Sequence, residues 1–443
     1  MTGLLSIGRS ALRAYSAALD TVSQNIANVE NADYVRRRTD LGDSTVTGYL
    51  NPLYAAESGL NGVRVNGIVR SGDEFLEASV RMSGSSLVRT DTMTNWLGTI
   101  ETGLSNAGDD VGTRLASFYS SADELAAAPF DTSLRTAFIN EIGATADTFQ
   151  RTAENLDQSI DQIGQRAGNE LLGLNQVLEN LAKINIELRK TPAGTQAAAG
   201  LLDQRDAALA VVSERIDVEI TLGDNGTATI RYGGEAIVGI GTSATLSMAD
   251  NPDGTFRVLV DGQGGKVPAN GLLAGLSRSR SAATSDLAQL DQMAEKFATQ
   301  VNDWHAAGRT DAGNPGVALV TGGGGATGLT LIAIAASELA VADASGKPNG
   351  NLLALAGLRT SGGVEKNWTQ LVSTHANLLL ATKNEGTAAS AIDRNARNGR
   401  DAVSRVDLDH ETADLVRLQQ AYEAASRVIQ VARELTQSIL AIF

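Results

Sequence analysis

The side chains that carry out most protein chemistry are few in this chain and form no catalytic pattern. Its three histidines, His305, His375 and His410, lie in unrelated segments, and the chain has no cysteine. A disulfide, a zinc-thiolate site and a thiol nucleophile are therefore excluded. The sequence also lacks a His-Glu-x-x-His metal motif, a Gly-x-Ser-x-Gly nucleophile turn and a phosphate-binding Gly-Lys-Ser/Thr loop. We expect no catalytic residue, no metal site and no cofactor.

Two runs of charged residues are expected to serve helix ends rather than ligands. Asp407, Asp409 and Glu411 precede an apolar helical pattern, where carboxylates stabilise a helix through its dipole. The run 36–38, three arginines, is interpreted as a solvated helix end. The chain has 36 Lys and Arg residues against 51 Asp and Glu, a net charge of −15, and shows no basic face that would attract phosphates. It also lacks a stretch of about 20 apolar residues, so neither a nucleic acid nor a membrane is an expected partner.

The most informative pattern is an apolar one that recurs at both ends of the chain. Apolar residues alternate at spacings of three and four, which makes one side of a helix apolar and lets two helices pair lengthwise. The residues expected to form this assembly interface are Leu12, Tyr15, Leu19, Val22 and Ile26 near the N-terminus, and Leu415, Leu418, Tyr422, Ile429, Ala432 and Ile439 near the C-terminus. We expect these helices to pair with one another or with neighbouring copies.

The elements between the ends are expected to be mostly helical. A three-four pattern without proline lies between Pro129 and Pro192 and predicts a long helix, with one or two breaks at its glycines. Short β-rich runs with Asp-Asn-Gly and Pro-Asp-Gly turns predict antiparallel hairpins within residues 217–267. The expected fold is mainly α with a smaller β part, an elongated coiled-coil-like trunk built from both chain ends and carrying an antiparallel β domain.

The expected division of the chain follows from these patterns. Its segments are 1–40, an N-terminal assembly helix and turn; 41–216, an extended segment and long helical trunk; 217–270, a small antiparallel β domain; 271–307, a trunk helix; 308–365, a Gly-rich insert whose structure stays open; 366–400, a trunk helix; and 401–443, a C-terminal assembly helix.

Two terminal motifs resemble those of a known family. The segment 23–28, Ser-Gln-Asn-Ile-Ala-Asn, followed by Tyr34-Val-Arg36, resembles the N-terminal signature of flagellar rod, hook and hook-associated proteins. In that family the intervening turn carries a glycine, whereas this chain has Asp33, which tolerates a left-handed conformation less well. The segments 406–411 and 419–430 are similar to the closing signature of the hook-associated protein 1 family. The motif positions are Asn25, Ile26, Asn28, Tyr34, Arg36, Asp409, Gln419, Gln420 and Tyr422.

The resemblance implies a structural protein of the bacterial flagellum, not an enzyme, that forms the junction between hook and filament by self-assembly. Its implied partners are its own copies in a ring, the hook protein, the second junction protein, and a flagellar export chaperone at the C-terminal helix. The implied location is extracellular, after export through the flagellar secretion channel without a cleaved signal peptide. Two alternatives are another flagellar axial protein (hook, distal rod or flagellin-like) and an enzyme carried in the middle domain.

Overall fold

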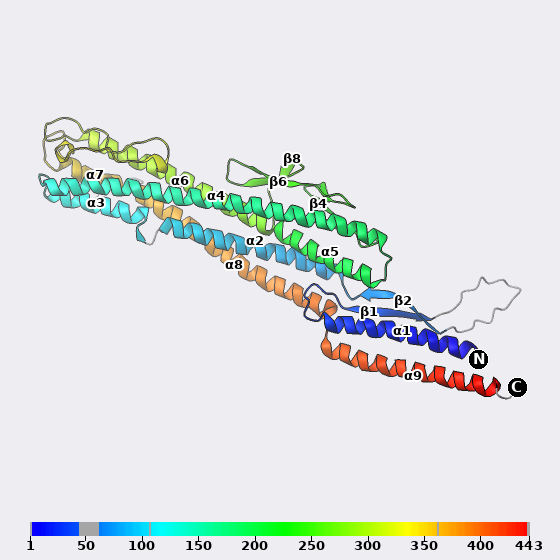
Figure 1. The fold of residues 1–443 in the computed structure, drawn as a ribbon. Helices are drawn as coiled ribbons and strands as arrows, with labels where there is room; N and C mark the ends of the chain where they lie inside the picture. Colours follow the sequence, from blue (N-terminus) through cyan, green and yellow to red (C-terminus); the bar gives the residue numbers. More distant parts are fainter. Residues whose placement is uncertain (1, 44–61, 106–107, 361–362, 441–443) are drawn as a thin grey trace. The chain divides into compact units, whose positions relative to one another are not determined.

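The computed structural model describes residues 2–43, 62–105, 108–360 and 363–440 (Figure 1). It is 68% helical and 12% strand, which confirms the mainly-α class with a smaller antiparallel β part. The helices are α1 Thr2–Ala27, α2 Glu74–Ser105, α3 Val111–Ala127, α4 Thr132–Lys190, α5 Gln196–Arg215, α6 Gly271–Ala307, α7 Gly350–Thr360, α8 Val364–Ser404 and α9 Leu408–Leu440. The strands are β1 Arg37–Asp43, β2 Val63–Arg70, β3 Glu219–Leu222, β4 Ala228–Tyr232, β5 Glu235–Val238, β6 Leu246–Asp250, β7 Phe256–Val260 and β8 Gln263–Lys266. Within the described ranges, no helix combines the length and apolarity needed to cross a bilayer.

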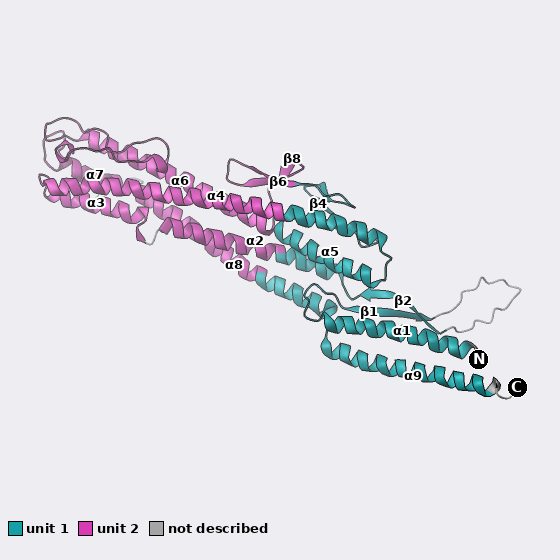
Figure 2. Ribbon diagram, in the orientation of Figure 1, with its two compact units in different colours: residues 1–84, 174–245, 390–443 teal, residues 85–173, 246–389 magenta. Residues whose placement is uncertain are grey.

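The chain forms two compact units, each made of separate stretches of sequence (Figure 2). Unit 1 contains residues 1–84, 174–245 and 390–443, and unit 2 contains residues 85–173 and 246–389. Both chain ends therefore belong to unit 1. The segment 217–270, expected as one β domain, holds two three-stranded sheets, β3-β4-β5 in unit 1 and β6-β7-β8 in unit 2. The seven-segment division of the chain stays a prediction, and much of its extended segment, residues 44–61, lies outside the described residues.

The long helix expected between two prolines is present as α4, and the breaks expected at its glycines do not occur. Each interior glycine costs a helix roughly 1 kcal/mol relative to alanine. The apolar positions of α4 are nevertheless deeply buried, including Ile142 and Phe149 in unit 2 and Leu174 and Leu178 in unit 1. Tertiary burial of this stripe outweighs the weak propensity, which is why the helix continues.

Unit 2 has an apolar core in which aromatic rings meet. The ring of Phe118 lies 5.4 Å from that of Phe138 and 5.5 Å from that of Phe297, centroid to centroid. Phe138 in turn lies 5.8 Å from Trp304, edge to face. These geometries are the ones that aromatic pairs favour, and each ring buries a large apolar area. The core of unit 2 therefore joins α3, α4 and α6.

The Gly-rich insert, whose structure the sequence leaves open, packs on α6 of unit 2. The side chain of Asn302 accepts a hydrogen bond at Oδ1 from the N–H of Leu319 at 2.8 Å and donates one from Nδ2 to the carbonyl of Val320 at 2.9 Å. The ring of His305 donates from Nδ1 to the carbonyl of Val317, and its Nε2 accepts the N–H of Ala340 at 2.9 Å. Two polar side chains of one helix thus satisfy the irregular backbone that covers them.

Unit 1 combines the chain ends with two small antiparallel ladders. β1 pairs with β2 in an antiparallel ladder with a bulge at Asp40/Leu41, and the N–H of Ile68 on β2 donates to the carbonyl of Gly194 at 2.7 Å. The sheet β3-β4-β5 is held to α4 by Asn185, whose side chain exchanges hydrogen bonds of 2.8 and 2.9 Å with the backbone of Ala228. Helices α1 and α9 lie side by side (Figure 1).

Candidate functional site

The paired helices α1 and α9 run in opposite directions. Gly8 near the start of α1 lies against Ile429 near the end of α9, whereas Asn25 at the end of α1 contacts Glu411 at the start of α9. Gly8 permits a close approach, because a Cβ there would lie only 2.6 Å from Cγ1 of Ile429. The two ends of one chain therefore form a single antiparallel pair.

The structure places the expected interface residues on or beside this pair. Val22 and Ala432 are buried; Leu12, Tyr15, Leu19, Ile26, Leu415, Leu418 and Ile429 are half-buried; Tyr422 is exposed; and the side chain of Ile439 lies outside the described residues. The buried apolar residues of the two helices are mostly small, among them Ala14, Ala18 and Ala425. A part in contacts between copies stays a prediction for all of these residues.

Asn25 is the centre of a buried polar cluster at one end of the pair. Its side-chain amide makes four hydrogen bonds: Nδ2 donates to the carbonyl of Arg37 at 2.8 Å and to Oε2 of Glu411 at 2.9 Å, while Oδ1 accepts from the hydroxyl of Tyr34 at 2.8 Å and the N–H of Arg37 at 3.1 Å. This uses the full capacity of an asparagine amide. We call Asn25, Tyr34, Arg36 and Glu411 the motif cluster.

Glu411 ties the C-terminal helix to this cluster. Its side chain is 1% exposed, and its Oε1 accepts a hydrogen bond from Nε of Arg36 at 2.6 Å. Burying a carboxylate is costly unless it is paired and hydrogen-bonded. Glu411 lies in the first turn of α9, where the sequence places a carboxylate that stabilises the helix dipole, but it is also buried and paired with Arg36, which the sequence does not predict. Asp407 caps the same helix end, since its Oδ1 accepts the N–H of Asp409 at 2.9 Å.

The arginine run is not a solvated helix end, because Arg37 begins β1 and is buried. Its guanidinium lies 4.6 Å from the ring centroid of Tyr34 and forms an ion pair with Asp203 of α5. Asp203 also binds Arg70 of β2 at 2.8 Å. Burial raises the pKa of the Tyr34 hydroxyl, although Arg37 beside it acts to lower it. The hydroxyl therefore stays protonated and able to donate to Asn25.

The turn between α1 and β1 forms without a left-handed residue at Asp33. In the described part of the chain, Asp261 is the one non-glycine residue with a positive φ. Asn31 makes the turn instead: its Oδ1 accepts the N–H of Asp33 at 3.1 Å, and its carbonyl accepts the N–H of Tyr34 at 3.1 Å. Asparagine favours such local turns, which explains why the glycine of the family motif is dispensable here.

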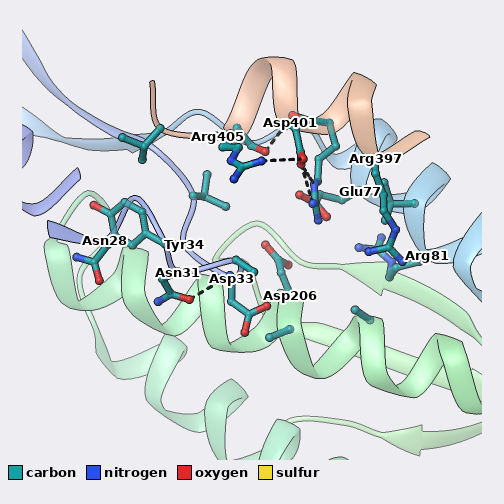
Figure 3. A pocket seen from close by; sticks show the side chains of 18 of the residues that line it. Asn28, Asn31, Asp33, Tyr34, Glu77, Arg81, Asp206, Arg397, Asp401 and Arg405 are labelled. Carbon is teal, nitrogen blue, oxygen red and sulfur yellow. Dashed lines mark hydrogen bonds and ion pairs between the residues drawn. The ribbon is translucent and has the colours of Figure 1, made fainter. Parts of the chain in front are cut away.

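This turn forms one wall of a cavity of about 410 Å³ in unit 1 (Figure 3). The other walls come from α2, α5 and the end of α8, and they carry charges of both signs, including Glu77, Arg81, Asp206 and Asp401. Burial raises the pKa of Glu77 and lowers that of Arg81, while each partly offsets the shift of the other. The cavity is polar and mixed in charge, and nothing in it selects one ligand chemistry.

The motif cluster gathers only part of the family motif. Asn25, Tyr34 and Arg36 meet there; Asn28 is half-buried and donates from Nδ2 to the carbonyl of Gln24 at 2.8 Å. Asp409, Gln419 and Gln420 are exposed on α9. Among the residues with defined placement, no group of three or more His, Asp or Glu side chains is arranged to hold a metal ion. The charged groups of the cluster bind one another, an arrangement suited to holding chain segments together.

Sequence reasoning did not include Glu411, Arg37 and Asp203 among the site residues. A signal for Glu411 was present, because it lies seven residues before Leu418 and so occupies the same position of the apolar repeat. Arg37 and Asp203 carry no such signal, since their partners are distant in sequence.

Comparison with known proteins places the chain in a family. A sequence model of a protein family, the flagellar hook-associated protein FlgK helical domain, matches residues 97–319, just over half of the 443 residues. The model of the flagellar basal body rod FlgEFG protein C-terminal matches residues 397–442, which include Glu411 and α9.

Two relatives with similar sequences are themselves flagellar hook-associated proteins. Flagellar hook-associated protein 1 of Bacillus subtilis is 25% identical over 98% of this chain and 97% of its own length. That of Salmonella typhimurium is 29% identical over 71% of this chain, and the match spans only 59% of the Salmonella protein. A solved structure, the flagellar hook junction protein FlgK of Burkholderia pseudomallei, aligns with a TM-score of 0.48 at 20% identity over 55% of this chain and 46% of its own. On the strength of the match to more than half of its length, the chain belongs to the flagellar hook-associated protein FlgK family.

Proposed function

We propose that the protein is a structural subunit of the bacterial flagellum that forms the junction between hook and filament by self-assembly through its paired terminal helices. Family membership supports a place in the flagellum, among the other axial components. The mutually paired charges of the motif cluster support a structural role, and we assign the protein no enzymatic activity.

The observation that carries this proposal is a second apolar stripe on α9. Val428, Val431 and Leu435, spaced three and four residues apart, are 41%, 54% and 45% exposed. We call them the outer stripe. The inner side of α9, with Ala425 and Ile429, already faces α1 of its own chain. A helix that served only its own chain would need a single apolar side, so the outer stripe fits contact with another molecule.

The partners are inferred from membership of the family, with the outer stripe as a contact surface. Copies of the chain meet in a ring, and the ring binds the hook protein on one side and the second junction protein on the other. A flagellar export chaperone covers the C-terminal helix before assembly. The assembled protein is extracellular, having passed through the flagellar secretion channel.

The test separates the two sides of α9 with three neighbouring substitutions. Val431→Asp should leave the α1–α9 pair intact but abolish the junction, because an unpaired carboxylate in an apolar contact costs several kcal/mol. Ile429→Asp should loosen the pair itself, and the junction should then be lost as a consequence. Gln430→Asp, at an exposed polar position between them, is the matched control and should do neither. Hydrogen exchange of α1 amides reports the pair, and labelled protein at the distal end of the hook reports the junction.

Two outcomes would contradict the proposal. Labelled protein distributed along the whole filament or within the rod would indicate another axial role. Normal junctions and motility with Val431→Asp would show that the outer stripe is not a contact between molecules.

A further inference from the structure

The apolar contact between α1 and α9 does not by itself define one register. In α9 the inner positions recur every seven residues, as Leu415, Tyr422, Ile429 and Thr436 and as Leu418, Ala425 and Ala432. In α1 the same spacing joins Leu12, Leu19 and Ile26. A slip of one helix by seven residues therefore brings apolar residues opposite apolar residues again. Helical pairs of this kind commonly obtain a unique register from a buried polar residue in the repeat.

Glu411 occupies such a position. It precedes Leu418 by seven residues, and it is the fully buried carboxylate bound by Asn25 and Arg36. In a slipped pair an apolar residue would face Asn25 and Arg36, and Glu411 would lie buried without them or beyond the end of α1. An apolar mismatch can be relieved by rotamer changes, whereas an unpaired buried charge cannot.

Two contacts at opposite ends of the pair agree on the register. Gly8 faces Ile429 and Asn25 faces Glu411, so 17 residues of α1 correspond to 18 residues of α9. At 1.5 Å per residue these stretches rise about 26 and 27 Å. The polar cluster and the glycine contact therefore belong to a single arrangement, with no slip between them.

We propose that Glu411, held by Arg36 and Asn25, is the residue that sets the register of α9 against α1. The carboxylate acts as a positioning group: it selects which residues of α9 face α1 and hence where the outer stripe is presented. The importance of that placement for the junction rests on the proposed function, but the register itself is a property of the single chain.

The absence of cysteine from the chain makes the register directly measurable. Ala425 lies four residues before Ile429 and Leu12 four residues after Gly8, so these two positions face each other in the structure's register. Ala425→Cys combined with Leu12→Cys reports this native register by disulfide formation in the soluble full chain. Ala425→Cys with Leu19→Cys reports a slip of seven residues, because the rise of about 10 Å over seven residues exceeds the Cα separation that a disulfide spans.

With Glu411 in place, the native pair should cross-link and the slipped pair should not. Arg36→Met with Glu411→Leu replaces the ion pair by apolar side chains, an exchange that commonly preserves stability. The yield of the slipped disulfide should then rise by about tenfold or more, because the cost that excludes the slipped register is gone. Asp409→Leu, two residues away and exposed, is the matched control and should leave the ratio unchanged.

A second variant tests the proposal by gain of a new register. Glu411→Leu with Leu418→Glu moves the carboxylate by seven residues, and the slipped disulfide should then dominate over the native one. Persistence of the native register in both double variants would overturn the proposal. Junction assembly is followed separately in cells, so that the proposed function and the register are tested independently. If the position of the carboxylate determines the register but the chain never forms junctions, the proposed function is contradicted and this inference stands.

Discussion

The core of unit 2 and the helix pair of unit 1 are held together by different means. In unit 2, large rings such as Phe118, Phe138 and Phe297 pack against one another. The hydrophobic stabilisation from their burial is roughly proportional to the apolar area removed from water and is largely non-directional. In the pair of unit 1, small residues such as Ala18 and Ala425 are buried, and directional bonds converge on Asn25 and Glu411. The difference teaches that the body of unit 2 relies on the quantity of buried surface, whereas the chain ends rely on a specific arrangement.

The largest effect is expected from breaking the core of unit 2. Phe118→Ala removes a ring that is almost fully buried and leaves a cavity among three other aromatic rings. We expect a loss of about 3–5 kcal/mol in the free energy of unfolding, measured by thermal or denaturant unfolding. Phe130→Ala is the control, because that ring is 74% exposed and its loss should change stability by about 0.5 kcal/mol or less. Equal losses from both changes would refute the comparison.

A smaller but more local effect is expected at the motif cluster. Asn25→Ala leaves the Tyr34 hydroxyl and the Arg37 N–H without their acceptor and Glu411 with one donor fewer. We expect a loss of roughly 2–3 kcal/mol, since buried polar groups without partners are costly. Hydrogen exchange should place this loss in α1 and β1 and leave the core of unit 2 protected. Gln420→Ala, at an exposed motif position, should leave exchange unchanged; faster exchange throughout unit 2 would contradict the assignment.

The smallest effect concerns two histidines of unit 2 that respond to pH in opposite ways. Burial acts to lower the pKa of His375, but its hydrogen bonds to Asp286 at 2.7 Å and to the carbonyl of Leu97 at 2.9 Å raise it above 6.5. Burial lowers the pKa of His305, which accepts a backbone N–H at Nε2.

The signs follow from proton linkage. The contribution of His375 is fully present below about pH 6.5 and is lost as pH rises through its raised pKa. The contribution of His305 is present above about pH 6.5 and is lost as pH falls toward its lowered pKa. His375→Gln should therefore reduce the melting temperature of unit 2 most on the acidic side of neutrality. His305→Gln should make the melting temperature of unit 2 fall less steeply as the pH is lowered. Melting curves between pH 5 and 8 measure both; parallel shifts at every pH would contradict the assignment.

The sequence predicted the helices of the chain ends because their apolar repeat is regular and local. It did not predict the burial of Glu411, since a carboxylate in the first turn of a helix is stabilised whether exposed or buried, and its partners Asn25 and Arg36 lie far away in the chain. The interpretation of the arginine run is wrong for the same reason, a partner distant in sequence: Arg37 forms its ion pair with Asp203 only when β1 and α5 lie together in the fold.

The insert in unit 2 escaped prediction for another reason. Its buried residues, such as Leu319, Val320 and Leu339, lie in irregular backbone, where no helical or strand period marks them. Their backbone is satisfied by side chains of a different element, Asn302 and His305. Hydrogen bonds of this kind depend on the tertiary fold and leave no local signature.

The hydrogen bond between Asn25 and Glu411 joins residues 386 positions apart in the chain. A contact of such high sequence separation closes a very large loop. The chain must lose the conformational entropy of that closure before the contact can stabilise the fold. Folding of the ends is therefore expected to be slow and late, after the residues between Asn25 and Glu411 have become compact. A chain whose C-terminal segment is not yet present cannot form the pair, because α9 is missing. The α1–α9 pair is therefore expected to form late, and the outer stripe on α9 takes its final position only once both terminal helices are present.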